Sequence, residues 1–349
     1  MDKKSRIGIL TGGGDCPGLN AAIRAVTKTA IKEDYEVIGI HDGWKGFIDN
    51  DYEVLDSIRT SGIIDRGGTI LGSSRFSPFD SEEATAKVFD VFKQLGLEAL
   101  VVLGGEGTLS ATSRISKMGL PVVGIPKTID NDVKETDFTI GFQTAVQIAT
   151  DALDRLRSSA ESHNRVMLLE VMGRHAGWIA TYSGLANGAD AILIPEIPLD
   201  EGKLDDLCRM LEGRTKKGKR FSIVVVAEGT ILEGKTVEKA KRDRSSGGGR
   251  QLLGGVGTVL GEIIAEKTGL DTRVTTLGYV QRGGTPVAYD RSLATAFGVK
   301  AVELIRAKDY GKMIALKGNK VISVPLELVA DGFKTMDLNI YKVAEVFFG

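Results

Sequence analysis

Residue types that mark several classes of protein are scarce in this chain of 349 residues. Its two cysteines, Cys16 and Cys208, are too few for a framework of disulfide bonds and favour a reducing compartment. Its three histidines, His41, His163 and His175, are not grouped with cysteines at the spacing of metal ligands, so we do not expect a zinc site.

Long apolar runs and a net charge of either sign are also missing. The N-terminal residues MDKKSRIGIL carry charges before only a short apolar run, which fits neither a signal peptide nor a membrane span. The 45 basic and 46 acidic side chains leave a formal net charge of −1, so no overall field attracts nucleic acid or an anionic membrane. The sequence predicts a cytoplasmic protein whose anionic ligands are bound by local clusters.

Glycine, in contrast, is abundant, with 44 glycines against 8 prolines. The glycines occur in groups such as TGGGD, RGGT, GGEGT and QRGGT, and the apolar and amphipathic segments between them exclude a collagen-like or low-complexity chain. Glycines directly after a strand let the main chain approach a ligand closely, commonly a phosphate. We therefore interpret these groups as candidate phosphate-binding loops.

Strands and helices alternate along the chain. Apolar runs at 6–10, 35–40, 99–105 and 120–126 are predicted strands, and apolar residues at helical spacing predict a helix over 19–31. This alternation indicates a parallel sheet covered by helices, with the glycine-bearing loops at the carboxyl ends of strands, where such sheets bind ligands.

A second set of elements follows about residue 142. A helix is expected over 143–157, and strand-like runs lie within RVMLLEVMGRHAG, ADAILIPE, FSIVVVAEG and RVTTLGYVQRGG. Because the chain is longer than one core usually serves, we predict an α/β protein of two Rossmann-like, three-layer lobes with mostly parallel sheets and an interlobe active-site cleft. The segment 237–251 is expected to be an exposed, mobile loop.

The first two glycine motifs suit a polyphosphate. TGGGDCPGLNAAIR (11–24) opens a helix, whose positive end and N–H groups favour an anion, but it matches neither a dinucleotide fingerprint nor a Walker loop. In GGEGT (104–108), the Glu106 carboxylate suits magnesium shared with phosphate oxygens, Thr108 can cap the next helix, and a side chain at Gly107 would intrude on the ligand. Each motif taken alone fits an ordinary glycine turn about as well.

The segment PKTIDND (126–132) supplies a cation and two carboxylates after a strand. Asp130 and Asp132 are two residues apart, so in an extended chain both would face one side. A carboxylate can take the proton of an acceptor hydroxyl, and the Lys127 ammonium can bind the anion that is transferred. Taken alone, the segment also fits a loop with Asx turns.

Strand ends of the second half carry Arg174 and Glu228, with Arg282 after the last of its strand-like runs and Arg165 and Arg273 close by in sequence. Forked guanidinium groups suit a phosphate monoester, and a carboxylate suits sugar hydroxyls, although any single arginine fits a surface ion pair. Together with the glycine motifs, these residues indicate a phosphoryl transferase that acts by positioning and charge stabilisation.

In order and spacing, GGGDCPGLNAAIR, RGGTILGSSRF, GGEGT, PKTIDND, EVMGRHAGW and LGYVQRGG resemble the motifs of the phosphofructokinase family, up to about Gly298. The resemblance implies the glycolytic transfer of a phosphoryl group from ATP to the 1-hydroxyl of fructose 6-phosphate, with Mg²⁺ on the polyphosphate. It implies a nucleotide and magnesium lobe (1–141 plus about 281–330) and a sugar-phosphate lobe (142–280 plus about 331–349).

The resemblance also implies roles for single residues. Asp130 matches the general base, Thr128 and Asp132 flank it as substrate and metal-site partners, and Arg174 would stabilise the moving phosphoryl group. The nucleotide-binding positions are matched by Gly14, Arg75, Phe76, Gly105, Glu106, Gly107 and Thr108, with Glu106 as the magnesium carboxylate. The substrate positions are matched by Thr128, Asp130, Asp132, Met172, Gly173, Arg174, Glu228, Tyr279 and Arg282. Arg165 and Arg273 match arginines that reach the 6-phosphate from a neighbouring subunit, which implies a homo-oligomer, dimer or tetramer, with an inactive monomer.

Three positions depart from the ATP-dependent pattern of that family. Lys127 is typical of pyrophosphate users, whereas Gly107 is typical of ATP users because an aspartate there would block the α-phosphate, and this combination occurs in the family's mixed-substrate group. We predict ATP as donor, since missing space cannot be compensated whereas an extra cation can be accommodated; pyrophosphate is the alternative. Glu106 replaces an aspartate, and Tyr279 replaces a histidine but can still donate to a phosphate oxygen.

Two further questions stay open at this point. A non-catalytic sensor of nucleotide or sugar phosphate remains an alternative to an enzyme. Allosteric control is suggested by similarity to the effector site of bacterial members, although an ordinary solvated charge run explains the lysines as well. The residues concerned are Arg24, Lys28, Arg157, Lys217 and Lys219, with Ser57 near a further position of that site.

Overall fold

The computed structural model describes residues 4–234, 254–330 and 332–349, and the chain divides into two compact units. Unit 1 comprises the described residues up to Thr144 together with the segment from Arg282 to Phe333, and unit 2 comprises the described residues between these segments and from Lys334 onward. The segment 237–251, for which the sequence predicts a mobile loop, lies outside the described residues.

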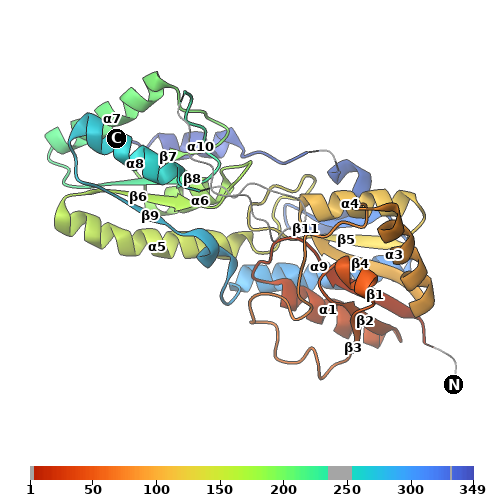
Figure 1. The fold of residues 1–349 in the computed structure, drawn as a ribbon. Coiled ribbons are helices and arrows are strands. Elements are labelled where there is room, and N and C mark those ends of the chain that lie inside the picture. Colours follow the sequence, from red (N-terminus) through yellow and green to blue (C-terminus); the bar gives the residue numbers. More distant parts are fainter. Residues whose placement is uncertain (1–3, 235–253, 331) are drawn as a thin grey trace. The chain divides into compact units, whose positions relative to one another are not determined.

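Unit 1 contains a seven-stranded sheet in the order β11-β10-β5-β4-β1-β2-β3. Its five inner strands are mutually parallel, whereas each edge strand is antiparallel to its neighbour. The strands are β1 (Arg6–Thr11), β2 (Glu36–Ile40), β3 (Tyr52–Leu55), β4 (Leu97–Gly104), β5 (Val122–Pro126), β10 (Lys312–Lys317) and β11 (Lys320–Pro325). The four strands predicted for the first half are confirmed, and β3, β10 and β11 are additions (Figure 1).

Helices cover the sheet of unit 1. They are α1 (Leu19–Lys32), α2 (Lys45–Asp49), α3 (Glu82–Leu95), α4 (Glu106–Lys117), α9 (Ala288–Arg306) and the 3₁₀ turn η2 (Leu326–Val329). Helices α1 and α9 pack so closely that a Cβ on Gly298 would lie 2.7 Å from Cβ of Ala25. This close approach requires a glycine at the contact.

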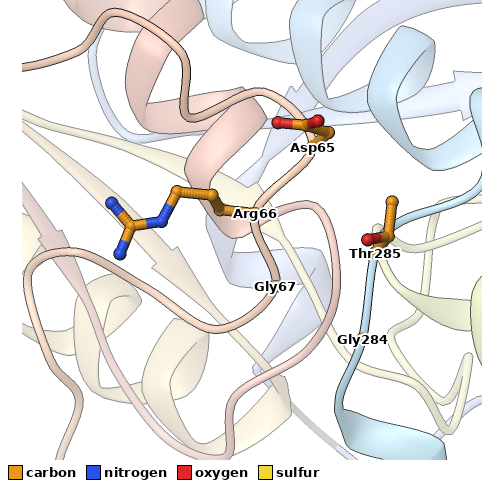
Figure 2. A pocket seen from close by; sticks show the side chains of 5 residues that line it. All are labelled: Asp65, Arg66, Gly67, Gly284 and Thr285. Atoms are coloured by element: carbon orange, nitrogen blue, oxygen red, sulfur yellow. The ribbon is translucent and has the colours of Figure 1, made fainter.

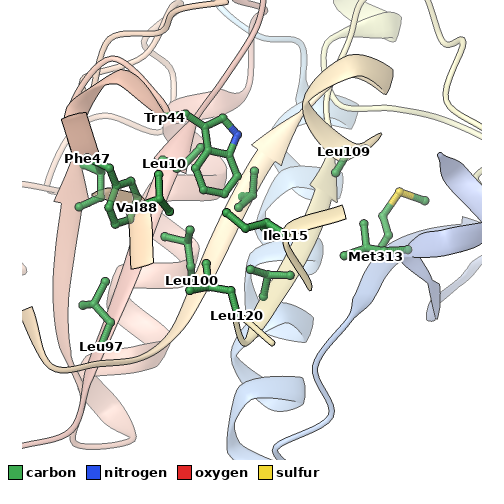
Figure 3. Close-up of a cluster of buried hydrophobic side chains, with 14 of the residues drawn as sticks. Leu10, Trp44, Phe47, Val88, Leu97, Leu100, Leu109, Ile115, Leu120 and Met313 are labelled. Carbon is green, nitrogen blue, oxygen red and sulfur yellow. The ribbon is translucent and has the colours of Figure 1, made fainter. Parts of the chain in front are cut away.

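A cluster of buried side chains joins the sheet of unit 1 to α3 and α4 (Figure 3). Leu10 and Leu100 project from the sheet, Val88 from α3 and Ile115 from α4, and Trp44 fills the space beside them. Burial of each such side chain stabilises the fold by about 1.5–3 kcal/mol. This core fixes the strands whose carboxyl ends carry the glycine motifs.

Unit 2 contains a four-stranded parallel sheet in the order β7-β8-β6-β9. Its strands are β6 (Val166–Val171), β7 (Ala191–Leu193), β8 (Ser222–Ala227) and β9 (Thr272–Thr276). Its helices are α6 (Trp178–Asn187), α7 (Glu201–Lys216), α8 (Val256–Thr268) and α10 (Leu338–Glu345), and α5 (Phe142–His163) and the 3₁₀ turn η1 (Gly278–Arg282) lie mostly within it. The predicted α/β fold with mostly parallel sheets is confirmed.

The core of unit 2 lies between its sheet and the helices α7 and α8. Leu211 of α7 and Leu260 of α8 are fully buried against β6 and β8. The buried carboxylate of Glu170, on β6, accepts hydrogen bonds from the N–H groups of Gly255 and Gly257 at the start of α8. That pairing satisfies helix N–H groups that have no partner within the helix. In the described part of the chain, no helix is long and apolar enough to cross a membrane.

Candidate active site

Three loops of unit 1 meet because β1, β4 and β5 are neighbours in the sheet. The N–H of Gly12 donates to the carbonyl of Leu103 at 2.9 Å, and the N–H of Lys127 donates to the carbonyl of Gly104 at 3.0 Å. The N–H of Gly13 donates to the carbonyl of Ser74 at 2.8 Å, which brings the GSSRF segment to the same place. The first three motifs predicted from the sequence thus lie together.

The glycines of these loops allow them to approach the start of α4. A Cβ on Gly104 would lie 2.4 Å from Cβ of Thr108, and one on Gly12 would lie 2.9 Å from Cγ2 of Thr108. Helix α4 begins at Glu106, and its N-cap residue, Gly105, has no side chain to bind the first N–H groups. The positive end of α4 is therefore suited to an anion.

The expectation that Thr108 caps α4 is wrong. A capping side chain belongs to the residue that precedes the helix, whereas Thr108 lies in the first turn. Gly107 also lies in that turn and is exposed, and a Cβ there would have no heavy atom within 4 Å. The space that the sequence analysis required beside Gly107 is present.

Lys127 is buried, with 2% of its surface exposed, and its Nζ donates to the carbonyl of Gly14. Burial lowers the pKa of Lys127 to about 8, because the charged form is disfavoured away from water. Thr108 and Lys127 both border Gly13: a Cβ there would lie 3.3 Å from Oγ1 of Thr108 and 3.4 Å from Nζ of Lys127. The Lys127 amine is therefore in contact with the glycine loop that follows β1, although Lys127 itself follows β5.

The segment after β5 is not extended, so the condition under which Asp130 and Asp132 would face one side is not met. Asn131, between them, has a φ of +51°, a left-handed conformation that asparagine tolerates better than most residues. Its amide holds this shape, because Oδ1 accepts from the N–H of Thr139 at 3.0 Å and Nδ2 donates to the carbonyl of Asp137 at 3.1 Å.

Asp130 differs from its neighbours in this packed segment. Its own backbone N–H donates to Oγ1 of Thr128 at 3.2 Å, which holds the Thr128 side chain against the backbone of Asp130. Its Oδ1 is buried, yet it accepts no hydrogen bond from the described residues. Leaving a buried acceptor unpaired costs about 1–3 kcal/mol, so such atoms call for an explanation.

Two other predicted residues of the nucleotide set, Arg75 and Phe76, follow Ser74. Arg75 is exposed, and Phe76 is partly buried against the core cluster of unit 1.

Arg282, predicted for the sugar phosphate, lies in unit 1 beside the glycine loop: its Nη1 donates to the carbonyl of Asp15 at 3.3 Å. A Cβ on Gly14 would lie 2.9 Å from the same nitrogen.

A pocket of about 540 Å³ in unit 1 contains Arg66, a residue for which the sequence predicted no role (Figure 2). It is lined by Asp65, Arg66, Gly67, Gly284 and Thr285. A signal was available, because the tetrapeptide Arg-Gly-Gly-Thr occurs both at 66–69 and at 282–285. The two copies meet, since a Cβ on Gly67 would lie 2.3 Å from the carbonyl oxygen of Gly284.

In unit 2, the carboxyl ends of β6 and β8 bring together four predicted substrate residues. The N–H of Glu228 donates to the carbonyl of Val171 at 2.8 Å, and the N–H of Gly229 donates to that of Gly173 at 3.1 Å. A Cβ on Gly229 would lie 2.1 Å from the carbonyl oxygen of Arg174. Met172, Gly173, Arg174 and Glu228 are thus neighbours, and Tyr279 follows β9 with 65% of its surface exposed.

Arg165 and Arg273 do not join that group. Arg165 precedes β6 and Arg273 is the second residue of β9, so both lie at the amino ends of strands. Both pair with Asp271, Arg165 through Nε at 2.6 Å. Among the residues proposed for an effector site, Arg157 donates through Nη2 to Oδ1 of Asn187 at 2.9 Å.

Comparisons with known proteins agree with this geometry. The model of the family described as "Phosphofructokinase" matches residues 6–305. The chain belongs to the phosphofructokinase family. It is therefore a phosphotransferase, as the motifs predict, and membership argues against a non-catalytic sensor.

Three similar proteins from this family illustrate its range. The chain is 48% identical to a pyrophosphate–fructose 6-phosphate 1-phosphotransferase of Amycolatopsis methanolica, over 99% of this chain and 100% of the relative. It is also 48% identical to ATP-dependent 6-phosphofructokinase 2 of Streptomyces coelicolor, over 98% of this chain and 100% of the relative. The solved structure of Pichia pastoris phosphofructokinase in the T-state matches with a TM-score of 0.83 and 33% identity, over 99% of this chain, which spans 37% of that longer one. Relatives named for either donor are equally similar.

Proposed function

We propose that this phosphofructokinase-family enzyme transfers the terminal phosphoryl group of ATP to the 1-hydroxyl of fructose 6-phosphate, giving fructose 1,6-bisphosphate and ADP. The observation that carries the proposal is the unpaired, buried Oδ1 of Asp130 in the same cluster of strand ends as the glycine loops. An acceptor hydroxyl that donated to this oxygen would remove the energetic penalty and would lose its proton to Asp130 during transfer.

The donor would lie against the glycine loop of β1 and the start of α4. Backbone N–H groups and the positive end of α4 offer charge stabilisation to the polyphosphate without requiring rearrangement during the reaction. In this proposal Gly14, Gly105, Gly107 and Thr108 border the polyphosphate, and Arg75 and Phe76 bind the rest of the nucleotide.

ATP is favoured over pyrophosphate by the surroundings of Gly107 and Lys127. A Cβ at Gly107 would have nothing within 4 Å, which leaves room for an α-phosphate and the rest of a nucleotide. The Lys127 amine donates to the carbonyl of Gly14, so its position is compatible with a longer donor. Pyrophosphate remains the second candidate because this buried cation borders Gly13.

The residues present fit Mg²⁺, which takes oxygen ligands and usually retains several waters beside one or two carboxylates and the substrate phosphates. The described residues contain no cluster of three or more histidine, cysteine or acidic side chains for a metal, which fits a shared site of this kind rather than an all-protein cage. We propose that Glu106 holds the ion with the donor, and that Asp132 lies nearby. When bound, Mg²⁺ supplies neutralisation of charge on the polyphosphate.

The sugar phosphate is proposed to contact Met172, Gly173, Arg174, Glu228, Tyr279 and Arg282, with Thr128, Asp130 and Asp132 at its reacting end.

We further propose a homo-oligomer in which Arg165 and Arg273 bind the 6-phosphate in a neighbouring subunit. Their location at the amino ends of β6 and β9, away from Met172 in their own unit, supports that arrangement. Mixed oligomers of Asp130→Asn and Arg165→Ala subunits would then regain activity that neither variant has alone. A cytoplasmic location is also part of the proposal.

A comparison of donors tests the proposed function. Purified protein is assayed with fructose 6-phosphate and Mg²⁺, with either ATP or pyrophosphate as the sole donor, by coupled detection of fructose 1,6-bisphosphate. We expect turnover with ATP. Turnover with pyrophosphate alone would overturn the choice of donor, and absence of turnover with both would overturn the acceptor.

A further inference from the structure

Asn20 is a buried polar residue near the start of α1, with 1% of its surface exposed. Its side-chain amide makes three hydrogen bonds, all to the backbone of one loop. Nδ2 donates to the carbonyls of Arg66 at 3.1 Å and Gly67 at 3.2 Å, and Oδ1 accepts from the N–H of Ile70 at 2.8 Å. One side chain therefore fixes both ends of the segment from Arg66 to Ile70.

The three contacts require a side chain of the length of asparagine that has both a donor and an acceptor. The two carbonyls require a donor and the Ile70 N–H requires an acceptor, so the orientation of the Asn20 amide follows from its partners. An aspartate of the same shape would still accept from Ile70, but its second oxygen would face the carbonyls of Arg66 and Gly67. An alanine would leave three backbone groups without their partner.

The same loop is held on its other sides by one close backbone contact and one contact between side-chain hydroxyls. Gly67 lies against the backbone of Gly284, where any Cβ would be 2.3 Å from the carbonyl oxygen. Oγ1 of Thr69 lies 3.0 Å from Oγ1 of Thr11, the last residue of β1, which is followed directly by the glycine loop. The loop is thus joined to the end of β1, directly before the glycine loop proposed to bind the donor.

Arg66 is the charged side chain that this loop presents. Its backbone is fixed by Asn20, whereas its side chain is exposed and extends on the side opposite Asp65 and Thr285 (Figure 2). A guanidinium group presents five N–H donors in a planar fork that fits phosphate oxygens, but it can bind them productively only if its backbone is held in place.

We infer that Asn20 is a positioning residue, which fixes the Arg66–Ile70 loop so that the Arg66 guanidinium meets the phosphates of the donor. This inference rests on the proposed function, because it takes the donor polyphosphate as the ligand of Arg66. Asn20 itself is buried in the protein and does not touch substrate. Its effect on the reaction passes through Arg66.

A double-mutant cycle separates this role from general support of the fold. The variants are Asn20→Ala, Arg66→Ala and the double variant, with Asn20→Asp as a second substitution of Asn20 that preserves its shape. Steady-state kinetics with ATP and fructose 6-phosphate give KM and kcat for each, and thermal unfolding reports the folded fraction. Thr27→Val is the matched control, because Thr27 is buried in the same helix and its Oγ1 has no hydrogen-bond partner among the described residues.

We expect Asn20→Ala to lower kcat/KM for ATP by about tenfold, chiefly through KM, with the KM for fructose 6-phosphate changed less than about twofold. In the Arg66→Ala background the same substitution should have an effect of less than about twofold, because the residue through which it acts is gone. Thr27→Val should match the parent in both constants.

Three outcomes would overturn the inference. One is an Asn20 effect of equal size with and without Arg66. Another is an equal loss from Thr27→Val, which would indicate a general structural role. If Asn20→Ala does not fold, the cycle is run with Asn20→Asp, and a parental KM for ATP in that variant would also contradict it. Failure of the proposed function is recognised separately, because the parent enzyme itself would then show no turnover with ATP.

Discussion

The loops that follow the inner strands β4 and β5 are neighbours at the carboxyl ends of these strands, yet they differ in packing. Around Gly107 the backbone faces open space, since a Cβ there would have no heavy atom within 4 Å. After β5, in contrast, Lys127 and Asn131 are buried and bound to the surrounding backbone. In the proposed function, the open loop would determine which donor fits, and the packed loop would hold the reactive carboxylate of Asp130 at a fixed position.

Within the packed loop, satisfied and unsatisfied groups are neighbours. Both ends of the Asn131 amide are hydrogen-bonded, and the Lys127 amine has the carbonyl of Gly14. Only a few residues away, Oδ1 of Asp130 has no partner among the described residues. In the proposed function, this rigid segment holds one buried, unpaired acceptor in place for the reaction. The following predictions test this contrast in order of expected effect.

The largest effect is expected from Asp130→Asn. The amide cannot accept the proton of the acceptor hydroxyl, so kcat should fall by about 10²–10⁴-fold while the protein remains folded. The matched control is Asp137→Asn in the same segment, because Oδ2 of Asp137 accepts a hydrogen bond from the N–H of Gly318 and no role in the reaction is predicted for it. Initial rates at saturating substrates and circular dichroism provide the measurement. Activity within a few-fold of the parent would remove Asp130 from the mechanism.

A smaller effect, confined to one donor, is expected from Gly107→Asp. The carboxylate would fill the open space and repel the α-phosphate, so kcat/KM for ATP should fall by about 10²-fold. Gly213→Asp is the control, because Gly213 lies on α7 with equally open surroundings and no predicted role. An unchanged kcat/KM for ATP would mean that the open loop does not determine donor size.

The third prediction concerns the stability of the packed loop. The pKa of Lys127 is lowered to about 8, below that of the unfolded chain, so the unfolded state binds more protons between about pH 8 and 10.5. The free energy of unfolding should therefore rise with pH in this window, by up to about 1.4 kcal/mol per pH unit from this group alone. Denaturant unfolding of the parent and of Lys127→Met at several pH values measures it.

In Lys127→Met the rise attributable to this group should disappear, whereas Lys117→Met, at an exposed position at the end of α4, should retain the parental profile. Identical profiles for the parent and Lys127→Met would show that Lys127 titrates like an exposed lysine. The packing of this loop would then be looser than its contacts imply.

Much of the fold was predictable because buried parallel strands are apolar over their whole length, as in LVVLG and VVGIP. The edge strand β3 was missed since its four residues include a glutamate and only Leu55 among them is buried. The hairpin of β10 and β11 was also missed, although the apolar run MIAL and the turn at Gly318 carry a signal for it. Edge strands are less uniformly apolar, and pattern alone identifies them poorly.

That the first three motifs lie at the carboxyl ends of strands in one parallel sheet was predictable, but the details of the site were not. The contact between Lys127 and Gly14 joins residues 113 positions apart and depends on a buried rotamer. The positive φ of Asn131, between Asp130 and Asp132, depends on bonds to Asp137 and Thr139. Such features arise from tertiary packing, which no local pattern encodes.

The most direct test of the central claim is a crystal structure of the enzyme with fructose 6-phosphate and a non-hydrolysable ATP analogue. We expect the 1-hydroxyl of the sugar to lie about 2.6–3.2 Å from Oδ1 of Asp130, the reach required of a general base. A sugar hydroxyl bound elsewhere, with Oδ1 of Asp130 still unpaired or bound to protein, would contradict it.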